Sequence, residues 1–366
     1  MDRAPREYLI GLNRIPEVTP RRMAVLLERF GSPELIWQAP VQALASLPGL
    51  AAAAERIAAS RDEEGLDREL ERAEREEVRI VTLLDLDYPA PLRAIEAPPA
   101  VLYLKGEGSL SAAPMIAVVG TRRSSGYGRS VAESLAADLA RCGITILSGL
   151  AVGIDAAAHR GALKAGGATI AVLGSGLFRL YPAAHRRLAE EILERGLLVS
   201  EYPLDLAPAK WTFPQRNRIL AGLVRGVVVV EAPERSGALI TARLALEQGR
   251  EVLAVPGNVT SAGSVGPNRL IRDGAALVEG AGDVLAQFPD LAPLLRPRAD
   301  DRAARLAALS PEARRAYDLI GLEPVHIDDI IACGQLSPTE AAHALLVLQM
   351  ENLIQELEGR RYGRTP

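Results

Sequence analysis

The sequence predicts an α/β protein with a mostly parallel central sheet, and two observations carry that prediction. Short, uninterrupted apolar segments recur between residues 115 and 257, each about as long as one strand. Stretches with the apolar spacing of helices lie between them. Continuous apolar strands that alternate with helices are typical of a parallel sheet that helices cover on both faces.

The order of these elements predicts a Rossmann-like sheet, which we assign to residues 76–292. The predicted strands are residues 115–120, 144–149, 169–174, 197–201, 227–232 and 251–257. The predicted helices between them include residues 127–142, 155–165, 183–195 and 238–249. Two further short strands, RIVTLL and AVLYLKG, are expected between residues 80 and 105, around a proline-rich connection.

Residues 1–75 are expected to form a separate small domain of short helices. Proline and glycine interrupt the helical spacing there, as in the stretch SLPGLAAAAERIAAS at 46–60. This stretch resembles a helix-hairpin-helix turn, whose backbone amides could hold a DNA phosphate. A Pro-Gly pair between helices is more commonly a simple turn, and both interpretations stay open.

A linker rich in proline and charge, residues 290–304, precedes a small C-terminal domain that we place at 305–366. Ser337 and Glu340 around Pro338 form a strong helix start, and IQELEGRRYGR suits a two-stranded wing that turns near Gly359. This order predicts a winged-helix-like domain. Residues 301–366 hold seven arginines against ten acidic residues, so protein contact is at least as good an interpretation as duplex binding.

Composition restricts the classes of function. The net charge of −4 argues against a nucleic-acid binder that works by overall charge, so any DNA site must rely on local positive charge. Two distant cysteines, Cys142 and Cys333, indicate neither a disulfide framework nor a metal site. No apolar run is long enough to span a membrane, and the N-terminus lacks the apolar stretch of a signal peptide. We therefore expect a cytoplasmic protein without a membrane partner.

Small and polar residues gather where the predicted strands end, which is the edge at which open α/β sheets bind ligands. The first strand runs into GTRRSSGYG at 120–128 and the second into SGLAVGID at 148–155. GSGL, EAPERSG and a Pro-Gly-Asn turn follow later strands. Glycines let backbone amides approach an anion, and each following helix adds a favourable dipole. Together these turns predict a phosphate-binding edge.

The pattern favours a polyanion over a nucleotide cofactor. The glycines at 120, 126 and 128 do not have Gly-x-Gly-x-x-Gly spacing, and the second strand ends in Ser148 where a ribose-binding acid would stand. No Gly-Lys-Ser/Thr motif follows a strand. Arg122, Arg123 and Arg129 flank the first turn instead. No cofactor is expected.

The segment from 200 to 223 points to single-stranded DNA. It combines Lys210, Arg216 and Arg218 with Trp211 and Phe213. Basic side chains hold phosphates and aromatic rings stack on unpaired bases, each stacked base contributing roughly 1–3 kcal/mol. Arg216 and Arg218 are two positions apart and cannot share one helix face, so we expect one of them to be structural.

No nucleophile–base pair is evident, and we expect no catalytic residues and no enzyme activity. Asp155 is interpreted as a helix N-cap and His159 as a packing residue. Glu231 could pair with one of the site arginines. The four histidines lack the spacing of metal ligands, so no metal site is expected.

At these residues the chain resembles the DprA/Smf DNA-processing family. The resemblance runs in order from about 117 to 275. It comprises VVGTRRSSGYG, SGLAVGIDAAAHRGAL, ATIAVLGSGLFRLYP, the SEYP…FPQRNRILAGL segment, EAPERSGALITARLALEQGR, and AVPGN followed by GSVGPNRLIRDGA. It implies an extended Rossmann fold that pairs into a homodimer, a sterile-alpha-motif-like domain before it and a winged helix after it. It also implies a protein that binds and protects single-stranded DNA and helps load the RecA recombinase in natural transformation.

The resemblance assigns DNA contacts to thirteen positions of this chain: Gly120, Arg122, Ser124, Ser148, Gly149, Gly153, Lys210, Phe213, Arg216, Asn217, Arg218, Ser236 and Gly237. Phe178 and His185 depart from the family pattern, where Asp and Asn are common, which puts DNA contacts near them in doubt. The alternative is a Rossmann-like nucleotide-processing enzyme of the phosphoribohydrolase type, although the double glycine of such enzymes is missing from EAPERSG. A winged helix that regulates duplex DNA is the third interpretation.

Overall fold

The computed structural model describes residues 3–294, 306–307, 309–321, 324–351, 353–357 and 359–364. The chain forms two compact units, Met1–Leu295 and Arg296–Pro366. The predicted domains at 1–75 and 76–292 thus belong to one unit, and the boundary between them stays a prediction. The part of the predicted linker beyond residue 294 lies outside the described residues.

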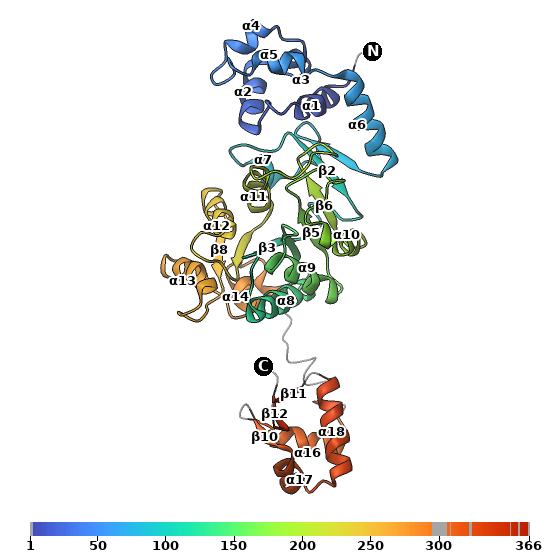
Figure 1. Ribbon diagram of the computed structural model, residues 1–366, viewed down its shortest axis with the longest axis vertical. Coiled ribbons are helices and arrows are strands. Elements are labelled where there is room, and N and C mark those ends of the chain that lie inside the picture. Colours follow the sequence, from blue (N-terminus) through green and yellow to red (C-terminus); the bar gives the residue numbers. More distant parts are fainter. Residues whose placement is uncertain are drawn as a thin grey trace. The chain divides into compact units, whose positions relative to one another are not determined.

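A nine-stranded sheet organises the first unit, as Figure 1 shows. Its order is β1-β2-β6-β5-β4-β3-β7-β8-β9, and the strands from β6 to β9 are parallel, whereas β2 pairs antiparallel with β6 and β1 with β2. The strands are β1 (Arg79–Thr82), β2 (Val101–Lys105), β3 (Met115–Val119), β4 (Thr145–Ser148), β5 (Thr169–Val172), β6 (Leu197–Ser200), β7 (Gly226–Val229), β8 (Glu251–Ala254) and β9 (Ala276–Leu277). The predicted parallel α/β sheet is confirmed.

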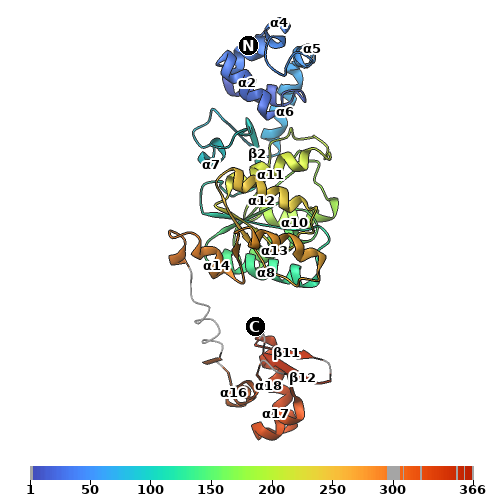
Figure 2. The same ribbon diagram turned by 90° about the vertical axis from the view of Figure 1, so that its left-hand side faces the viewer.

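Helices lie on both faces of this sheet, as Figures 1 and 2 show. One apolar cluster joins the sheet to α11 and α12, and a second joins it to α8, α9 and α14. The helices are α7 (Ala90–Arg93), α8 (Gly126–Arg141), α9 (Ile154–Lys164), α10 (Arg186–Leu193), α11 (Thr212–Leu223), α12 (Gly237–Glu247), α13 (Val265–Arg272) and α14 (Ala281–Ala286). Burial of strands on both faces explains why they are uninterrupted apolar runs.

Six helices precede the sheet: α1 (Pro5–Asn13), α2 (Pro20–Phe30), α3 (Pro33–Gln38), α4 (Val41–Ala45), α5 (Ala54–Ala59) and α6 (Glu63–Arg75). Their apolar side chains share a cluster with residues of β2, β5 and β6, including Tyr103, Ala171 and Leu198. The 46–60 stretch consists of a turn at Pro48 and Gly49 followed by α5. These helices therefore pack on the edge of the sheet that β1 and β2 complete.

The C-terminal unit has the predicted winged-helix arrangement. It contains α16 (Pro311–Leu319), α17 (Ile327–Gly334), α18 (Pro338–Met350) and the three-stranded sheet β10 (Val325–His326), β12 (Arg361–Arg364) and β11 (Ile354–Leu357). Ser337 caps α18, because its hydroxyl accepts from the Glu340 amide and its amide donates to the Glu340 carboxylate. The wing turns through Gly359, whose φ of 80° is favourable for glycine.

Among the described residues, no helix is both long and apolar enough to cross a membrane. No group of three or more His, Cys, Asp or Glu side chains in that part of the chain is arranged to hold a metal ion. Cys142 and Cys333 are both free thiols.

Candidate nucleic-acid interface

The predicted glycine- and serine-rich turns meet at the edge formed by the carboxyl ends of the parallel strands. There the chain leaves β3 for α8 on one face of the sheet and leaves β7 for α12 on the other face. Strand order reverses between these two strands, and ligands of open α/β sheets bind at such points. The Thr121 amide donates to the Glu231 carbonyl at 2.7 Å, which ties the two exits together. A Cβ on Gly120 would lie 2.5 Å from Ile154 and 2.8 Å from the Glu231 carbonyl, so only glycine fits here.

The β3–α8 turn carries Arg122 and Ser124, and its conformation depends on Glu231. The Ser125 hydroxyl caps α8 by accepting from the Gly128 amide at 2.9 Å. The buried Glu231 carboxylate accepts from both the Ser125 amide, at 2.9 Å, and the Ser125 hydroxyl. The expected pairing of Glu231 with a site arginine is therefore wrong, because its two oxygens hold the turn instead. Arg122 is exposed beside this turn, and Ser124 is half-buried.

Aromatic side chains at this edge form two contact groups, one of which includes Arg122. The Arg122 guanidinium lies 5.1 Å from the centre of the Phe213 ring, and the Phe213 and Tyr181 rings are 5.6 Å apart. Trp211 packs edge-on against Tyr202 with 5.8 Å between ring centres. Tyr181 and Trp211 are 46% and 52% exposed and Phe213 is half-buried, so parts of these rings are open to solvent.

The β4–α9 turn brings Ser148, Gly149 and Gly153 to the same edge. The Ser148 hydroxyl donates to the Val118 carbonyl at 2.7 Å and is buried. Gly153 has a φ of 88°, and a Cβ there would lie 2.4 Å from the Thr121 carbonyl. A side chain at this position would thus meet both backbone strain and a steric clash. The turn therefore packs against the backbone of Thr121 and Arg122.

Asp155 stabilises this turn, but it is not the predicted N-cap of α9. The N-cap is Gly153, and the Asp155 carboxylate accepts from the amides of Gly149 and Ala151, at 3.1 and 3.4 Å. Burial raises the pKa of Asp155 above its ordinary value, while the nearby Arg216 and these amides oppose the shift.

Arg216 is buried beneath the turn and is only 5% exposed. Its guanidinium donates to the Gly149 carbonyl at 2.9 Å and to the Val172 carbonyl. Gly149 leaves the room for it, since a Cβ there would lie 2.5 Å from the guanidinium nitrogens. Burial lowers the pKa of Arg216, and the attraction of Asp155 opposes that shift. This guanidinium joins the ends of β4 and β5.

Arg218 is also engaged within the protein. It forms an ion pair with Glu201, and the exposed fractions of the two side chains are 12% and 5%. Burial raises the pKa of Glu201, against the attraction of Arg218. We expected one arginine of this helix to be structural, and the structure places both guanidinium groups in protein contacts.

The remaining predicted residues lie on the surface around the same edge. Lys210 is exposed immediately before α11. The Asn217 amide group reaches the Gly237 carbonyl at 3.5 Å, which connects α11 with the start of α12. Ser236 is the N-cap of α12, and Gly237 is exposed with nothing within 4 Å of a Cβ built on it.

The two histidines in this region make structural contacts. The His159 ring is fully buried, and its Nδ1 lies 2.7 Å from the Thr169 hydroxyl, as expected for a packing residue. Burial is the main cause that lowers the pKa of His159 to about 3. His185, which departs from the family pattern, is bonded through Nδ1 to the Leu150 carbonyl at 2.8 Å.

The sequence pattern does not single out Tyr181 as a neighbour of Phe213 and Arg122. Its contact with Phe213 depends on the path of the loop after β5, which spacing does not reveal. The one sequence feature that could have indicated Tyr181 is its position before Pro182 in the loop that follows a predicted strand.

Comparisons with known proteins place the chain in a family. Residues 79–289 match the family model described as DNA recombination-mediator protein A, and residues 300–360 match the DprA winged helix domain. The chain is 50% identical over 199 residues to Protein Smf of Escherichia coli, a match that covers 54% of this chain and 53% of that protein. The chain thus spans about half the length of that relative.

Two solved structures resemble this one. The X-ray structure of DNA processing protein A from Streptococcus pneumoniae matches with a TM-score of 0.69 and 38% identity, over 79% of this chain and 99% of that one. A structure of DNA processing protein A from Helicobacter pylori, reported for its unique single-stranded DNA binding mode, matches with a TM-score of 0.52 and 30% identity, over 58% and 96%. With its Rossmann-like sheet and its winged helix both matched, the chain belongs to the DprA/Smf family of DNA recombination-mediator proteins.

Proposed function

We propose that this protein binds single-stranded DNA at the carboxyl edge of its sheet and does so without catalysing a reaction. The observation that carries the proposal is the group formed by Arg122, Phe213 and Tyr181. An exposed cation next to accessible rings suits a strand whose bases are unpaired, because the charge attracts phosphates and the rings stack on bases. The similar protein of H. pylori, with its reported single-stranded DNA binding mode, supports the same ligand.

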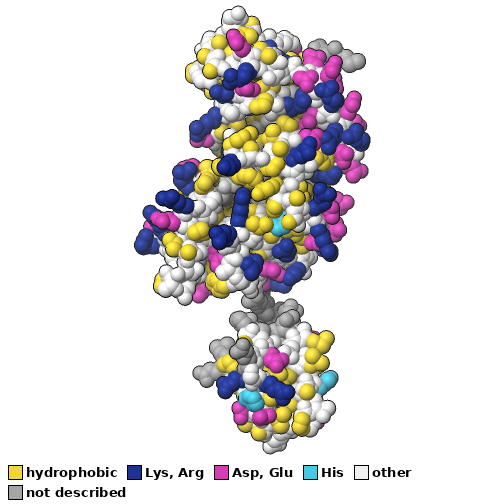
Figure 3. Space-filling view, in the orientation of Figure 1, with side chains coloured by type: hydrophobic (Ala, Val, Ile, Leu, Met, Phe, Trp, Pro, Cys, Tyr) yellow, Lys and Arg dark blue, Asp and Glu magenta, His cyan; other side chains and the backbone are white. Residues whose placement is uncertain are grey.

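The small number of cations at this edge supports binding of a single strand over a duplex. Basic side chains are scattered among acidic and apolar ones over the face that Figure 3 shows. Duplex binding without base contacts depends on many phosphate contacts, whereas a single strand gains additional affinity from stacking.

The nucleotide-processing alternative fits this edge poorly. In nucleotide-binding Rossmann folds the helix amides after the first strand bind phosphate. In this chain the buried Glu231 carboxylate already accepts from the Ser125 amide at 2.9 Å. A phosphate bound at the Ser125 amide would have to displace this carboxylate, whereas a DNA phosphate bound by the exposed Arg122 would not.

We further propose that the protein protects single-stranded DNA and helps load the RecA recombinase in the cytoplasm, as a homodimer formed through the Rossmann-like domain. This part rests on family membership. It is tested by following RecA assembly on oligonucleotides coated with a single-strand-binding protein, with and without this protein, and by the mass of the protein in solution.

Titration of labelled oligo-dT and of a duplex of equal length, followed by fluorescence anisotropy, tests the central step. The proposal expects tighter binding of the single strand and a salt slope of about −0.7 per phosphate contact. Equal or tighter binding of the duplex would overturn it. Release of free base from nucleoside monophosphates would favour the enzyme instead.

A further inference from the structure

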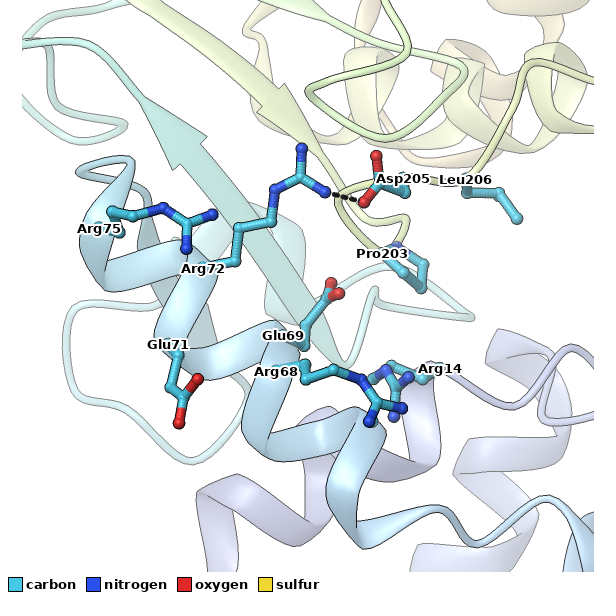
Figure 4. Close-up of a pocket in the computed structure, with 10 residues that line it drawn as sticks. Arg14, Arg68, Glu69, Glu71, Arg72, Arg75, Pro203, Asp205 and Leu206 are labelled. Atoms are coloured by element: carbon cyan, nitrogen blue, oxygen red, sulfur yellow. Dashed lines mark hydrogen bonds and ion pairs between the residues drawn. The ribbon is translucent and has the colours of Figure 1, made fainter.

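A second cationic feature lies beside the proposed DNA site, in a cleft of about 550 Å³ between α6 and the loop after β6. Arg14, Arg68, Arg72 and Arg75 face Pro203–Leu206 across it, and we call it the arginine cleft (Figure 4). Figure 4 shows Glu71 extending away from Asp205, while Glu69 points toward Pro203.

Of the three acidic side chains that line the arginine cleft, Glu69 and Asp205 are held by contacts within the protein, and Glu71 extends away from Asp205. The Glu69 carboxylate accepts from the Leu204 amide at 2.8 Å. Asp205 pairs with Arg72 and, at 3.6 Å, with Arg179. These contacts hold the two walls of the cleft in place and leave the remaining arginines as its chemically available groups.

Three arginines of the cleft have only long ion pairs, although Arg14 also donates to the Asp62 backbone carbonyl at 3.4 Å. Arg14 and Arg68 both approach the same Asp62 oxygen, at 3.8 and 3.7 Å. Arg68 also lies 3.6 Å from Glu64, and Arg75 lies 3.7 Å from Glu76. These separations exceed hydrogen-bond length, so most guanidinium N–H donors of Arg68 and Arg75 are available. Both side chains are about two-thirds exposed. Guanidinium groups that are exposed and loosely paired suit the oxygens of a phosphate.

The arginine cleft is connected to the proposed DNA site through the loop after β5. The amides of Gly176 and Phe178 donate to the carbonyls of Leu206 and Leu204, at 2.9 and 3.0 Å. The Phe178 ring has Arg72 at 4.4 Å and Lys105 at 5.2 Å from its centre. Three residues further on, Tyr181 of the same loop packs against Phe213. One short loop therefore joins the stacking group to the cleft.

We propose that the arginine cleft binds backbone phosphates of the same single strand, after that strand has passed the Arg122–Phe213–Tyr181 group. The inference rests on the proposed function and extends it to a longer path. It also gives Phe178, which departs from the family pattern, a role: its ring holds Arg72 at the junction. Stacking is confined to the first site, so the cleft contributes charge and no base preference.

The test compares two strand lengths, oligo-dT of about 6 and of about 25 nucleotides, since only the longer one can exceed a single site. The Arg68→Gln/Arg75→Gln variant should bind the short oligonucleotide as the parent does. It should bind the long one more weakly, with a salt slope smaller by about 1.4 for two lost phosphate contacts. The ratio of parent affinity to variant affinity for the long oligonucleotide should then fall about sevenfold between 50 and 200 mM salt.

Two further variants make the comparison specific. Arg141→Gln/Arg272→Gln removes the same charge from exposed ends of α8 and α13, at the opposite edge of the sheet, and should leave both affinities unchanged. Asp62→Asn keeps a capping side chain on α6 and removes the carboxylate that Arg14 and Arg68 share, and it should tighten binding of the long oligonucleotide alone.

Parent-like affinity and salt slope of the Arg68→Gln/Arg75→Gln variant on the long oligonucleotide would overturn the inference and leave the proposed function standing. Equal weakening by the opposite-edge variant would also overturn it, because the effect would then be one of overall charge. Failure of the parent to bind either oligonucleotide would refute the proposed function itself.

Discussion

Arg122 and Arg216 lie at the same edge of the sheet, yet their surroundings are opposite. Arg122 is exposed and lies over the Phe213 ring, whereas Arg216 is 5% exposed and donates to the carbonyls of Gly149 and Val172. The exposed arginine is available to a ligand, and the buried one shapes the surface on which the ligand would lie. A binding motif of this kind therefore contains both contact residues and the residues that position them.

Arg216→Ala should produce the largest effect, as a loss of stability. The substitution leaves two strand-end carbonyls without their donor and Asp155 buried without its nearby positive charge. We expect the free energy of unfolding to fall by about 3–5 kcal/mol. Urea unfolding measures it, with the exposed Arg141→Ala as the control. A change under about 1 kcal/mol together with lost DNA binding would show that Arg216 is a contact residue after all.

Phe213→Ala should weaken binding and leave folding nearly intact. Loss of one stacked base corresponds to about 1–3 kcal/mol of binding free energy. Anisotropy with oligo-dT gives the affinity, and thermal unfolding gives the stability. Phe213→Tyr keeps the ring and should bind like the parent. If the alanine variant binds normally, the ring is only a support for Arg122.

His159 should make stability fall with acid. Its pKa is about 3 in the folded protein, against about 6.5 when unfolded, so the unfolded chain takes up the proton first as the pH falls. Its contribution is complete above about pH 6.5 and is lost progressively toward pH 3. Between pH 7 and pH 5 this loss is about 2 kcal/mol. In His159→Gln, which cannot titrate, urea unfolding at the two pH values should lack this component, and an unchanged pH dependence would contradict the assignment.

Removal of residues 305–366 should have the smallest effect. Residues 1–295 form a compact unit that contains all thirteen predicted contact positions. Affinity of the truncated chain for oligo-dT should stay within about 0.5 kcal/mol of the parent's. Complete loss of DNA binding would move the principal site to the winged helix.

The sequence predicted the fold well because the relevant signals are local. Apolar runs identified the strands from β3 to β8, and Ser337 with Glu340 identified the start of α18. How residues 1–75 pack on the sheet could not be predicted from the sequence, because it depends on long-range contacts such as that of Tyr103 with the N-terminal helices. Spacing along the chain carries no information on such contacts.

The sequence predicted which residues gather at the candidate site better than it predicted the contact that each of them makes. The glycine- and serine-rich turns do meet at one edge, since the ends of parallel strands converge. Which polar group pairs with which could not be predicted: Glu231 holds Ser125, and Asp155 holds the amides of Gly149 and Ala151. Burial decided these roles, and burial of a charged side chain is set by the tertiary fold.

The fluorescence of Trp211 during an oligo-dT titration tests the central claim most directly. The chain has two tryptophans, and Trp37 is 7% exposed in the helical core while Trp211 is 52% exposed beside the stacking group. We predict saturable quenching by single-stranded DNA that parallels binding by anisotropy and disappears in Trp211→Phe. DNA binding with unchanged Trp211 emission, or equal quenching by duplex, would contradict a single-strand site at this edge.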